Sequence, residues 1–406
     1  MKGIEHNMPE IVAPAGNLEK LRFAAHYGAD AVYFGGGDFN LRMQSDNFTM
    51  GEVEEALMIC SDAGVKSIFL LNAFLHEGDV PGAREKIRSL RHLRFDAIMV
   101  SDPGMMLLIR EEGITSRIHL STQMSTLNHL AVRFWQKAGI DRIVLAREAT
   151  LEEIRIIRDH SDAEIEVFVH GALCVAYSGR CLLSRHLAGR DANLGDCAQS
   201  CRWRYSLVEE KRPGVYLDIL ENPGGTELLS SLDLCLIGKI PDYMSAGVDA
   251  FKIEGRMKSL YYAANTTRIY RHARERAAAE DFDTHLRFWR NELDLVSHRP
   301  YTEDLFGNAI ADRGDGAYIR KVLFLGYRRG SGTGETVDVM VLNPIRKGEM
   351  IEVIYPIDGS VRDDACTVMD IHGEDGTGAD MALPGRPWHI TFDREIGEHA
   401  ILRRRR

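Results

Sequence analysis

Eight short apolar runs, each followed by a segment with helical character, recur along the first 253 residues and constrain the fold more than any other feature. Apolar runs that alternate with helical patterns are typical of βα units on a parallel sheet. The runs lie at 11–13, 31–34, 67–71, 97–100, 117–120, 142–145, 165–169 and 250–253. Eight such strands predict an α/β fold that closes into a TIM-like (β/α)8 barrel.

A recurring glycine supports this barrel independently of the strand count. Four of the apolar runs are preceded by a similar phrase, at 27–30, 63–66, 138–141 and 246–249. Each phrase places a glycine where a helix would end in a left-handed residue before the chain re-enters the sheet. Apolar residues that recur at intervals of three and four predict helices before several of these phrases, including 18–26, 51–63, 83–93 and 127–138.

The seventh and eighth runs are separated by about eighty residues, far more than an ordinary βα connection. This insertion, at about 172–249, holds Cys174, Cys181, Cys197 and Cys201, four of the seven cysteines. It begins at the end of strand seven, and the carboxyl ends of barrel strands carry the chemistry of barrel enzymes. The four thiols are therefore expected at the active face.

The chemistry of four neighbouring thiols favours an iron-sulfur cluster or zinc over hard cations. Six, fifteen and three residues separate the four cysteines, so only the last two resemble one pair of a zinc ribbon. Buried structural cysteines are the alternative, because free cysteine is often buried. Cys60 and Cys366 lie far away in sequence and are expected to be structural, whereas Cys235 is near enough to be a substitute ligand.

Composition narrows the setting. No signal peptide and no run of eighteen apolar residues is found, so we expect a cytoplasmic protein with reduced thiols, no disulfides and no membrane span. The net charge of −10 argues against a surface that is basic throughout, but it allows a local basic face. Residues 403–406, all arginine, are expected to form a solvated tail and receive no role.

Polar side chains follow nearly every predicted strand. A local role in the loop is the commoner explanation for any one of them, but their recurrence predicts a shared pocket at the barrel mouth. They are Arg42, Asn72, Ser101, Asp102, Ser121, Thr122, Gln123, Arg147, Glu148, His170, Glu254 and Arg256.

Beyond the eighth strand we expect a helix at 260–279 and then a polar bridge through Trp289 to Tyr301. The pattern changes after about residue 316. Apolar segments at 337–341, 349–354 and 388–392 lie between turn residues and predict a small β-barrel or sandwich. The predicted domains are therefore 1–315, the barrel with its cysteine-rich insertion, and 316–406.

Several motifs resemble those of the peptidase U32 family. The signature lies at 166–174 and 179–184, and supporting phrases lie at 13–17, 27–33, 101–104, 119–123 and 252–256. The segment 197–203 and the β-rich end are most similar to family members associated with 5-hydroxyuridine at the tRNA wobble position. The resemblance therefore implies a cytoplasmic RNA-modifying enzyme that acts on tRNA.

The same resemblance implies a cofactor and a co-substrate. A 4Fe-4S cluster would be held by Cys174, Cys181, Cys197 and Cys201, with zinc as the less favoured occupant. Relatives in the ubiquinone pathway take their last ligand well downstream, so Cys235 stays open as an alternative to Cys201. The implied co-substrate is prephenate, a small dicarboxylate.

Roles for the polar residues follow as hypotheses. Two carboxylates call for guanidinium groups, for which Arg42, Arg147 and Arg256 are candidates, with Asn72 and Gln123 as further substrate-binding residues. A uracil splayed from its stack needs an aromatic surface. Tyr177, Trp203 and Tyr205 are candidates for it, although each can equally be a core residue. His170, Glu254 and Arg256 are the catalytic candidates, and a structural salt bridge is the alternative for the last two.

Two other functions remain open at this stage. A peptidase or collagenase-like hydrolase would use Cys174 with His170 as its base, although the sequence lacks both the His-Glu-x-x-His and the Gly-x-Ser-x-Gly patterns. An accessory protein would carry the cluster without performing the chemistry.

Overall fold

The structure is a computed structural model, and the ranges it describes have several gaps. They are 8–41, 47–173, 183–190, 196–200, 207–208, 216–217, 220–222, 225–227, 232–277, 279, 281–303, 318–356 and 363–406. Among these residues, no helix is long and apolar enough to cross a membrane.

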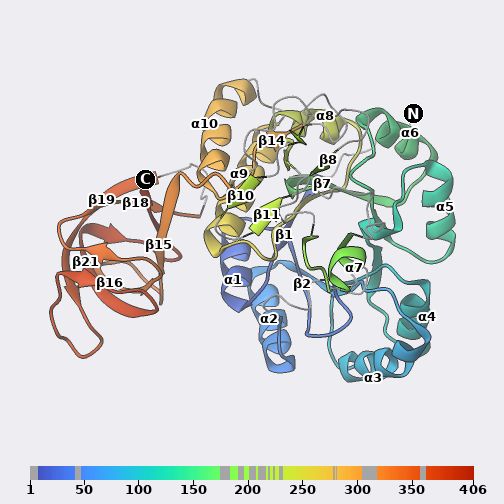
Figure 1. Ribbon diagram of the computed structural model, residues 1–406, viewed down its shortest axis with the longest axis horizontal. Helices are drawn as coiled ribbons and strands as arrows, with labels where there is room; N and C mark the ends of the chain where they lie inside the picture. The colour runs from blue at the N-terminus through green and yellow to red at the C-terminus, as the bar shows by residue number, and fades with distance from the viewer. Residues whose placement is uncertain are drawn as a thin grey trace.

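Eight parallel strands close into a barrel surrounded by helices, which confirms the predicted TIM-like fold (Figure 1). The last strand, β13, pairs with both β1 and β7 and so completes the ring. The strands are β1 (Glu10–Pro14), β2 (Ala31–Phe34), β3 (Lys66–Leu71), β4 (Ala97–Val100), β5 (Arg117–Leu120), β6 (Arg142–Val144), β7 (Glu164–Ala172) and β13 (Ala250–Ile253).

Polar caps set where most of the outer helices begin. Asn17, Asp102, Asn128 and Ser259 each accept a backbone N–H in the first turn, and Thr49 and Thr150 form capping boxes with a glutamate. The helices are α1 (Leu18–His26), α2 (Met50–Ala63), α3 (Val80–Leu90), α4 (Pro103–Glu111), α5 (His129–Lys137), α6 (Leu151–His160), α8 (Ile240–Ser245) and α9 (Leu260–Arg276). Short 3-10 turns lie at Glu77–Asp79, Thr122–Met124 and Ile237–Lys239.

An aspartate clamp joins the strands in pairs at the amino end of the barrel. The carboxylates of Asp30, Asp96, Asp141 and Asp249 accept backbone N–H groups of β1, β3, β5 and β7 at 2.7, 2.8, 2.8 and 2.7 Å. Each aspartate directly precedes the next strand, so the clamp recurs once in every two βα units. Three of the four belong to the glycine phrases that signalled the barrel in the sequence.

The insertion leaves the barrel after β7 and returns to it before β13. Its described elements are α7 (Leu183–Ala188), β8 (Leu207–Val208), β9 (Tyr216–Leu217), β10 (Leu220–Asn222), β11 (Gly225–Glu227) and β12 (Asp233–Cys235). Strand β12 pairs antiparallel with the end of β7 and parallel with β14 (Tyr301–Thr302). The barrel wall is thus extended by two short strands beside β7.

The expected polar bridge through Trp289 is wrong, because this stretch forms helix α10 (Phe282–Leu295). Trp289 and Leu293 are fully buried against the rest of the barrel core. Glu292 is also buried, since it pairs with arginines inside the protein. The many polar residues of this stretch therefore led to the prediction of a bridge where the chain forms an amphipathic helix.

The C-terminal part is a separate closed barrel of antiparallel strands, which confirms the small β-barrel. The predicted boundary at 315 lies outside the described residues. The barrel strands are β15 (Val322–Arg328), β16 (Gly334–Val341), β18 (Met350–Ile354), β19 (Asp363–His372), β21 (Arg386–Ile396) and β22 (Ile401–Arg405), with β17 (Ile345–Arg346) and β20 (Met381–Ala382) as a separate pair. In Figure 1 this barrel lies beside α1, α9 and α10.

The terminal arginines do not form a solvated tail, because most of them belong to β22. The side chain of Arg403 is 1% exposed and forms a two-pronged ion pair with Glu292 of α10, at 2.7 and 2.9 Å. Its Nε donates to Glu352 of β18 at 2.8 Å. A charge that composition assigns to solvent thus joins the two barrels.

Candidate active site at the mouth of the barrel

Three strand ends bring a set of polar side chains together at the carboxyl end of the barrel. Asn72, after β3, accepts the backbone N–H of Leu41 at 3.3 Å and donates to the Ser121 hydroxyl at 3.5 Å. The Gln123 side-chain oxygen accepts from Ser101 at 3.3 Å and also from Ser121. The predicted pocket residues after β3, β4 and β5 therefore form one connected rim.

Arg256 holds the loop that follows β2. Its guanidinium is buried and donates to the side-chain oxygens of Asn40 and Asn47, at 3.0 and 2.9 Å. These two asparagines flank residues 42–46, a stretch that includes Arg42 and lies outside the described residues. Arg256 therefore ties together the two described residues on either side of this stretch.

Arg147 presents a different kind of cation. Its guanidinium lies 3.9 Å from the centre of the Phe168 ring, a cation–π stack. The side chain is only partly buried, and within the described ranges it has no carboxylate partner. A guanidinium that is oriented by a ring but not neutralised can bind an anionic ligand.

Below Phe168 the barrel interior holds paired charges that sequence reasoning missed. Lys252 of β13, 4% exposed, contacts Glu166 of β7 at 2.5 Å. Arg142 of β6 pairs with Glu10 and Glu164 at 2.8 and 2.7 Å, and lies 3.5 Å from Glu166. Burial lowers the pKa of Lys252 below its usual range, and Glu166 opposes this shift. Charged residues at inward positions of otherwise apolar runs were the available signal.

His119 of β5 lies among these charges and is 3% exposed. Neither of its ring nitrogens has a hydrogen-bond partner within the described part of the chain. Burial, and then the nearby Arg142 and Lys252, lower the pKa of this imidazole well below its usual value. His119 is therefore neutral at physiological pH.

A bulge in β7 turns His170 away from the barrel interior. The pairing with β13 passes from Lys252 opposite Phe168 to Ile253 opposite His170, so Val169 is an extra residue. The ring nitrogens of His170 lie 3.3 and 3.4 Å from the hydroxyls of Tyr270 and Tyr301, on the outer side of β7. His170 is thus separated from the rim that holds Asn72 and Gln123.

The surroundings of His170 keep it uncharged. Burial lowers its pKa to about 3, although Asp233 opposes the shift. The hydroxyls of Tyr270 and Tyr301 donate to the backbone carbonyls of Val169 and Leu293, both at 2.8 Å. This cluster joins β7 to α9 and β14.

Glu254 lies where β13 meets the start of the insertion. Its backbone N–H donates to the carbonyl of His170 at 2.9 Å, and its carbonyl accepts from the Tyr262 hydroxyl at 3.0 Å. Gly171 adopts a φ of +107°, and a Cβ at this position would lie 2.6 Å from the Glu254 carbonyl oxygen. Only glycine allows this close approach, while the Glu254 side chain remains partly exposed.

Cys197 is the one predicted metal ligand within the described residues. It is partly buried, and its Sγ accepts the backbone N–H of Gln199 at 3.4 Å. The side-chain amide nitrogen of Gln199, Nε2, lies 3.8 Å from the sulfur of Met257, which directly follows Arg256. The Cys197 loop therefore reaches the carboxyl end of β13.

The remaining cysteine assignments stay predictions. Cys174, Tyr177, Cys181, Cys201 and Trp203 lie outside the described residues. Within the described ranges, no group of three or more metal-ligating side chains is found.

The reserve ligand Cys235 has the properties of a structural thiol. It is 7% exposed, lies opposite His170 in the pairing of β12 with β7, and is 3.8 Å from the Tyr270 hydroxyl. Burial raises the pKa of Cys235 to about 11, which disfavours the thiolate that a metal requires.

Comparison with known proteins agrees with the motifs and the fold. The sequence model of Peptidase family U32 matches residues 16–313, which cover the insertion and the barrel from α1 onward. The chain belongs to peptidase family U32. The family resemblance carried by the sequence motifs is thereby confirmed.

Proteins similar to this chain carry different names. tRNA hydroxylation protein P1 of Bacillus subtilis (strain 168) is 36% identical over 98% of this chain and 94% of the relative. tRNA hydroxylation protein P of Escherichia coli (strain K12) is 34% identical over 86% of each chain. A protein named Collagenase from Porphyromonas gingivalis (strain ATCC BAA-308 / W83) is 37% identical over 73% of each chain. Family membership alone therefore does not choose between RNA modification and proteolysis.

Proposed function

We propose that this chain hydroxylates RNA, converting the tRNA wobble uridine to 5-hydroxyuridine with prephenate as co-substrate and a 4Fe-4S cluster as cofactor. The relative that spans 98% of the chain is a tRNA hydroxylation protein, which supports this choice. The observation that carries it is Arg147, an oriented guanidinium without a carboxylate partner in the described ranges. It lies at the end of the barrel that the Cys197 loop also reaches.

The donor set is compatible with a cluster held by Cys174, Cys181, Cys197 and Cys201. An amide N–H that points to a sulfur stabilises negative charge on it, and Cys197 has such a contact from Gln199. When bound, the cluster supplies electron transfer, which side chains perform poorly. The buried Cys60 and Cys366 are unsuited to this role, because burial raises the pKa of each thiol to about 12.

In this proposal Arg147 binds a carboxylate of prephenate through its planar pair of N–H donors. The Phe168 ring beneath it keeps the guanidinium in place and shields one of its faces from water. Arg256 acts one step further away, because its guanidinium is engaged by Asn40 and Asn47. Asn72 and Gln123 offer amide groups to the substrates, while Tyr177 and Trp203 remain candidates for stacking on the uracil.

The catalytic candidates separate into two roles. Glu254 has a partly exposed carboxylate at the mouth and remains a candidate for moving a proton. His170 is buried behind β7, which supports a positioning role for the strand that leads into Cys174. Its contacts with Tyr270 and Tyr301 also weaken the hydrolase alternative, since both ring nitrogens, one of which a general base would need, already face tyrosine hydroxyls.

The cofactor can be tested without any activity assay. Anaerobically purified protein is expected to contain iron and sulfide with broad visible absorption, and a Cys197→Ala variant to lose most of both. Cys60→Ala and Cys366→Ala are matched controls that should keep them. Zinc alone, or iron that survives Cys197→Ala, would contradict the proposed cluster.

The reaction is tested by expressing the chain in a bacterial host that lacks its own tRNA uridine hydroxylation. Nucleoside analysis of the host tRNA is expected to show 5-hydroxyuridine with the intact chain and little with Cys197→Ala. Omission of prephenate synthesis should also abolish it. Cleavage of denatured collagen without modified tRNA would instead favour the peptidase, and a cluster with neither activity would favour an accessory protein.

A further inference from the structure

Four arginines lie along helix α3 and the loop after it, on the outer wall of the barrel. Arg84, Arg88 and Arg91 are spaced by four and three residues, so they share one face of the helix and its end. Arg94 follows in the loop to β4. We call Arg84, Arg88, Arg91 and Arg94 the arginine row.

The row begins near the mouth and ends at the opposite side of the barrel. Helix α3 starts a few residues after Asn72 of the rim and runs back toward the amino end of β4. At about 1.5 Å per residue, Arg84 and Arg91 are about 10 Å apart along the helix axis. Figure 1 shows α3 and α4 side by side on this part of the wall.

Carboxylates neutralise only part of the row. Glu112 at the end of α4 lies 2.7 Å from Arg84, 3.1 Å from Arg88 and 3.9 Å from Arg91. Glu111 pairs with Arg84 at 2.7 Å. Four guanidinium groups therefore face two carboxylates, and the uncompensated charge lies toward Arg91 and Arg94.

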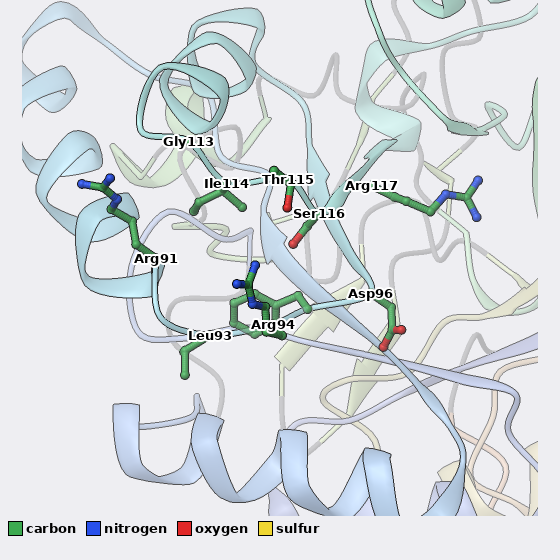
Figure 2. Close-up of a pocket in the computed structure, with 10 residues that line it drawn as sticks. Arg91, Leu93, Arg94, Asp96, Gly113, Ile114, Thr115, Ser116 and Arg117 are labelled. Atoms are coloured by element: carbon green, nitrogen blue, oxygen red, sulfur yellow. The ribbon is translucent and has the colours of Figure 1, made fainter.

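The lower end of the row lines a cleft of about 230 Å³. In Figure 2, Arg94 lies below the hydroxyls of Thr115 and Ser116, with Arg91 and Arg117 on the two sides. Arg94 is exposed and has no carboxylate partner within the described ranges, and the Arg91 side chain is 59% exposed. Arg117 is committed to Glu164 at 2.6 Å, so it adds no free charge.

The one carboxylate in the cleft is already engaged. Asp96 is the clamp residue before β4, and it accepts both the backbone N–H and the hydroxyl of Ser67, at 2.8 and 2.9 Å. The cleft holds the Arg94 guanidinium, which has no carboxylate partner in the described ranges, the exposed Arg91 side chain and two hydroxyls. This set of donors suits a phosphate group.

We infer that the arginine row binds the phosphodiester backbone of the RNA whose base is modified at the mouth. This inference rests on the proposed function. The row runs from the rim down the wall, so an RNA stem that leaves the mouth over α3 would place successive phosphates along it. The net charge of −10 does not favour RNA binding over the whole surface, so a local row of arginines is where we expect phosphate contacts.

The test compares two double variants with the same change in charge. Arg91→Gln/Arg94→Gln removes the lower end of the row, and Arg133→Gln/Arg155→Gln removes two exposed arginines from α5 and α6. Binding of an unmodified tRNA transcript is measured by fluorescence anisotropy at several salt concentrations. The first variant should bind about tenfold more weakly, with a salt dependence reduced by between one and two phosphate contacts. The second should match the unaltered protein.

The outcomes separate this inference from the proposed function. Equal binding by both variants would overturn the arginine row as an RNA surface, while intact hydroxylation would leave the proposed function standing. Absence of RNA binding and of hydroxylation in the unaltered protein would remove the proposed function itself. Titration with inorganic phosphate completes the test. Saturable phosphate binding that depends on Arg91 and Arg94, with unchanged tRNA binding, would assign the cleft to a small anion and overturn the RNA assignment.

Discussion

The lower barrel and the mouth differ in whether their charged side chains have partners of opposite charge. Below the mouth, the buried Lys252 and Arg142 share the carboxylates of Glu166, Glu10 and Glu164, so every one of these charges has an opposite partner. At the mouth, Arg147 lies on an aromatic ring and has no carboxylate in the described ranges. Matched charges hold a structure together, whereas an unmatched charge that is fixed in place awaits a ligand.

The two regions also differ in regularity. At the amino end, the aspartate clamp repeats with nearly the same distance in each pair of strands. At the carboxyl end, each strand finishes differently: in an amide rim after β3, a stacked cation after β6, a bulge in β7 and a buried guanidinium after β13. The comparison predicts that substitutions in the lower barrel mainly affect stability and those at the mouth mainly affect activity.

The largest loss of stability is expected when one partner of the buried pair is removed. Lys252→Met leaves the carboxylate of Glu166, which is fully buried, with only the more distant Arg142. Such a change typically costs about 3 to 5 kcal/mol of unfolding free energy. Urea unfolding at neutral pH measures it. The double variant Lys252→Met/Glu166→Gln should recover at least half of the loss, and equal stability of Lys252→Met and the unaltered protein would refute the ion-pair role.

An intermediate effect is expected from acid at His170. Because burial lowers its pKa to about 3, the unfolded chain binds a proton between pH 6.5 and about 3 and the folded chain does not. The stability that this group contributes is complete above pH 6.5 and is lost as the pH falls through that window. Between pH 7 and 5 the loss amounts to about 2 kcal/mol.

His170→Gln isolates this term, because glutamine does not titrate. The unfolding free energy of the unaltered protein should fall by about 2 kcal/mol more than that of His170→Gln over the same pH range. Parallel pH profiles would show that His170 is protonated, or accessible, in the folded protein. His170 would then belong with the residues of the mouth and not with those of the buried interior.

A smaller effect is expected from a single aspartate clamp. Asp141 is the simplest of the four, since its one described side-chain contact is the backbone N–H of Ile118 at 2.8 Å. Asp141→Ala leaves this buried donor unpaired and should cost about 1.5 kcal/mol of unfolding free energy. Asp159→Ala, at an exposed position of α6, is the control and should cost little. An equal loss in both variants would mean that the clamp adds no stability of its own.

The regular region was the easier one to predict from sequence. The glycine phrases carry three of the four clamp aspartates, so the barrel and its strand order could be read from the pattern. Long-range partners were not readable. Nothing in the run of arginines at 403–406 indicates that Arg403 forms an ion pair with Glu292, on a helix more than a hundred residues earlier.

The mouth was predicted only in part. Asn72, Gln123 and Arg147 follow their strands as expected, because the carboxyl ends of parallel strands meet at one edge. His170 does not join them, because one extra residue in β7 reverses the direction of its side chain, and no local signal marks that bulge. The ligand set remains a prediction in Cys174, Cys181 and Cys201, which lie outside the described residues.

The smallest change in stability, and the sharpest test of the comparison, is expected at Arg147. Arg147→Ala removes one cation–π stack, which is worth about 0.5 to 1 kcal/mol, and leaves no buried charge behind. Hydroxylation of tRNA should nevertheless fall at least about tenfold, since each 1.4 kcal/mol of lost ligand binding corresponds to a factor of ten. Arg147→Lys should recover only part of the activity, because lysine keeps the charge but loses the planar pair of donors.

Urea unfolding and nucleoside analysis of the same preparations of Arg147→Ala separate the two roles. Lost hydroxylation with retained stability would place Arg147 at a ligand site, and a prephenate concentration that restores the activity would identify the ligand it binds. Lost stability of the size expected for Lys252→Met would place Arg147 with the structural charges of the lower barrel. Arg147 would then count among the structural charges of the interior, and the mouth would lose its one described cation without a carboxylate partner that was assigned to a ligand.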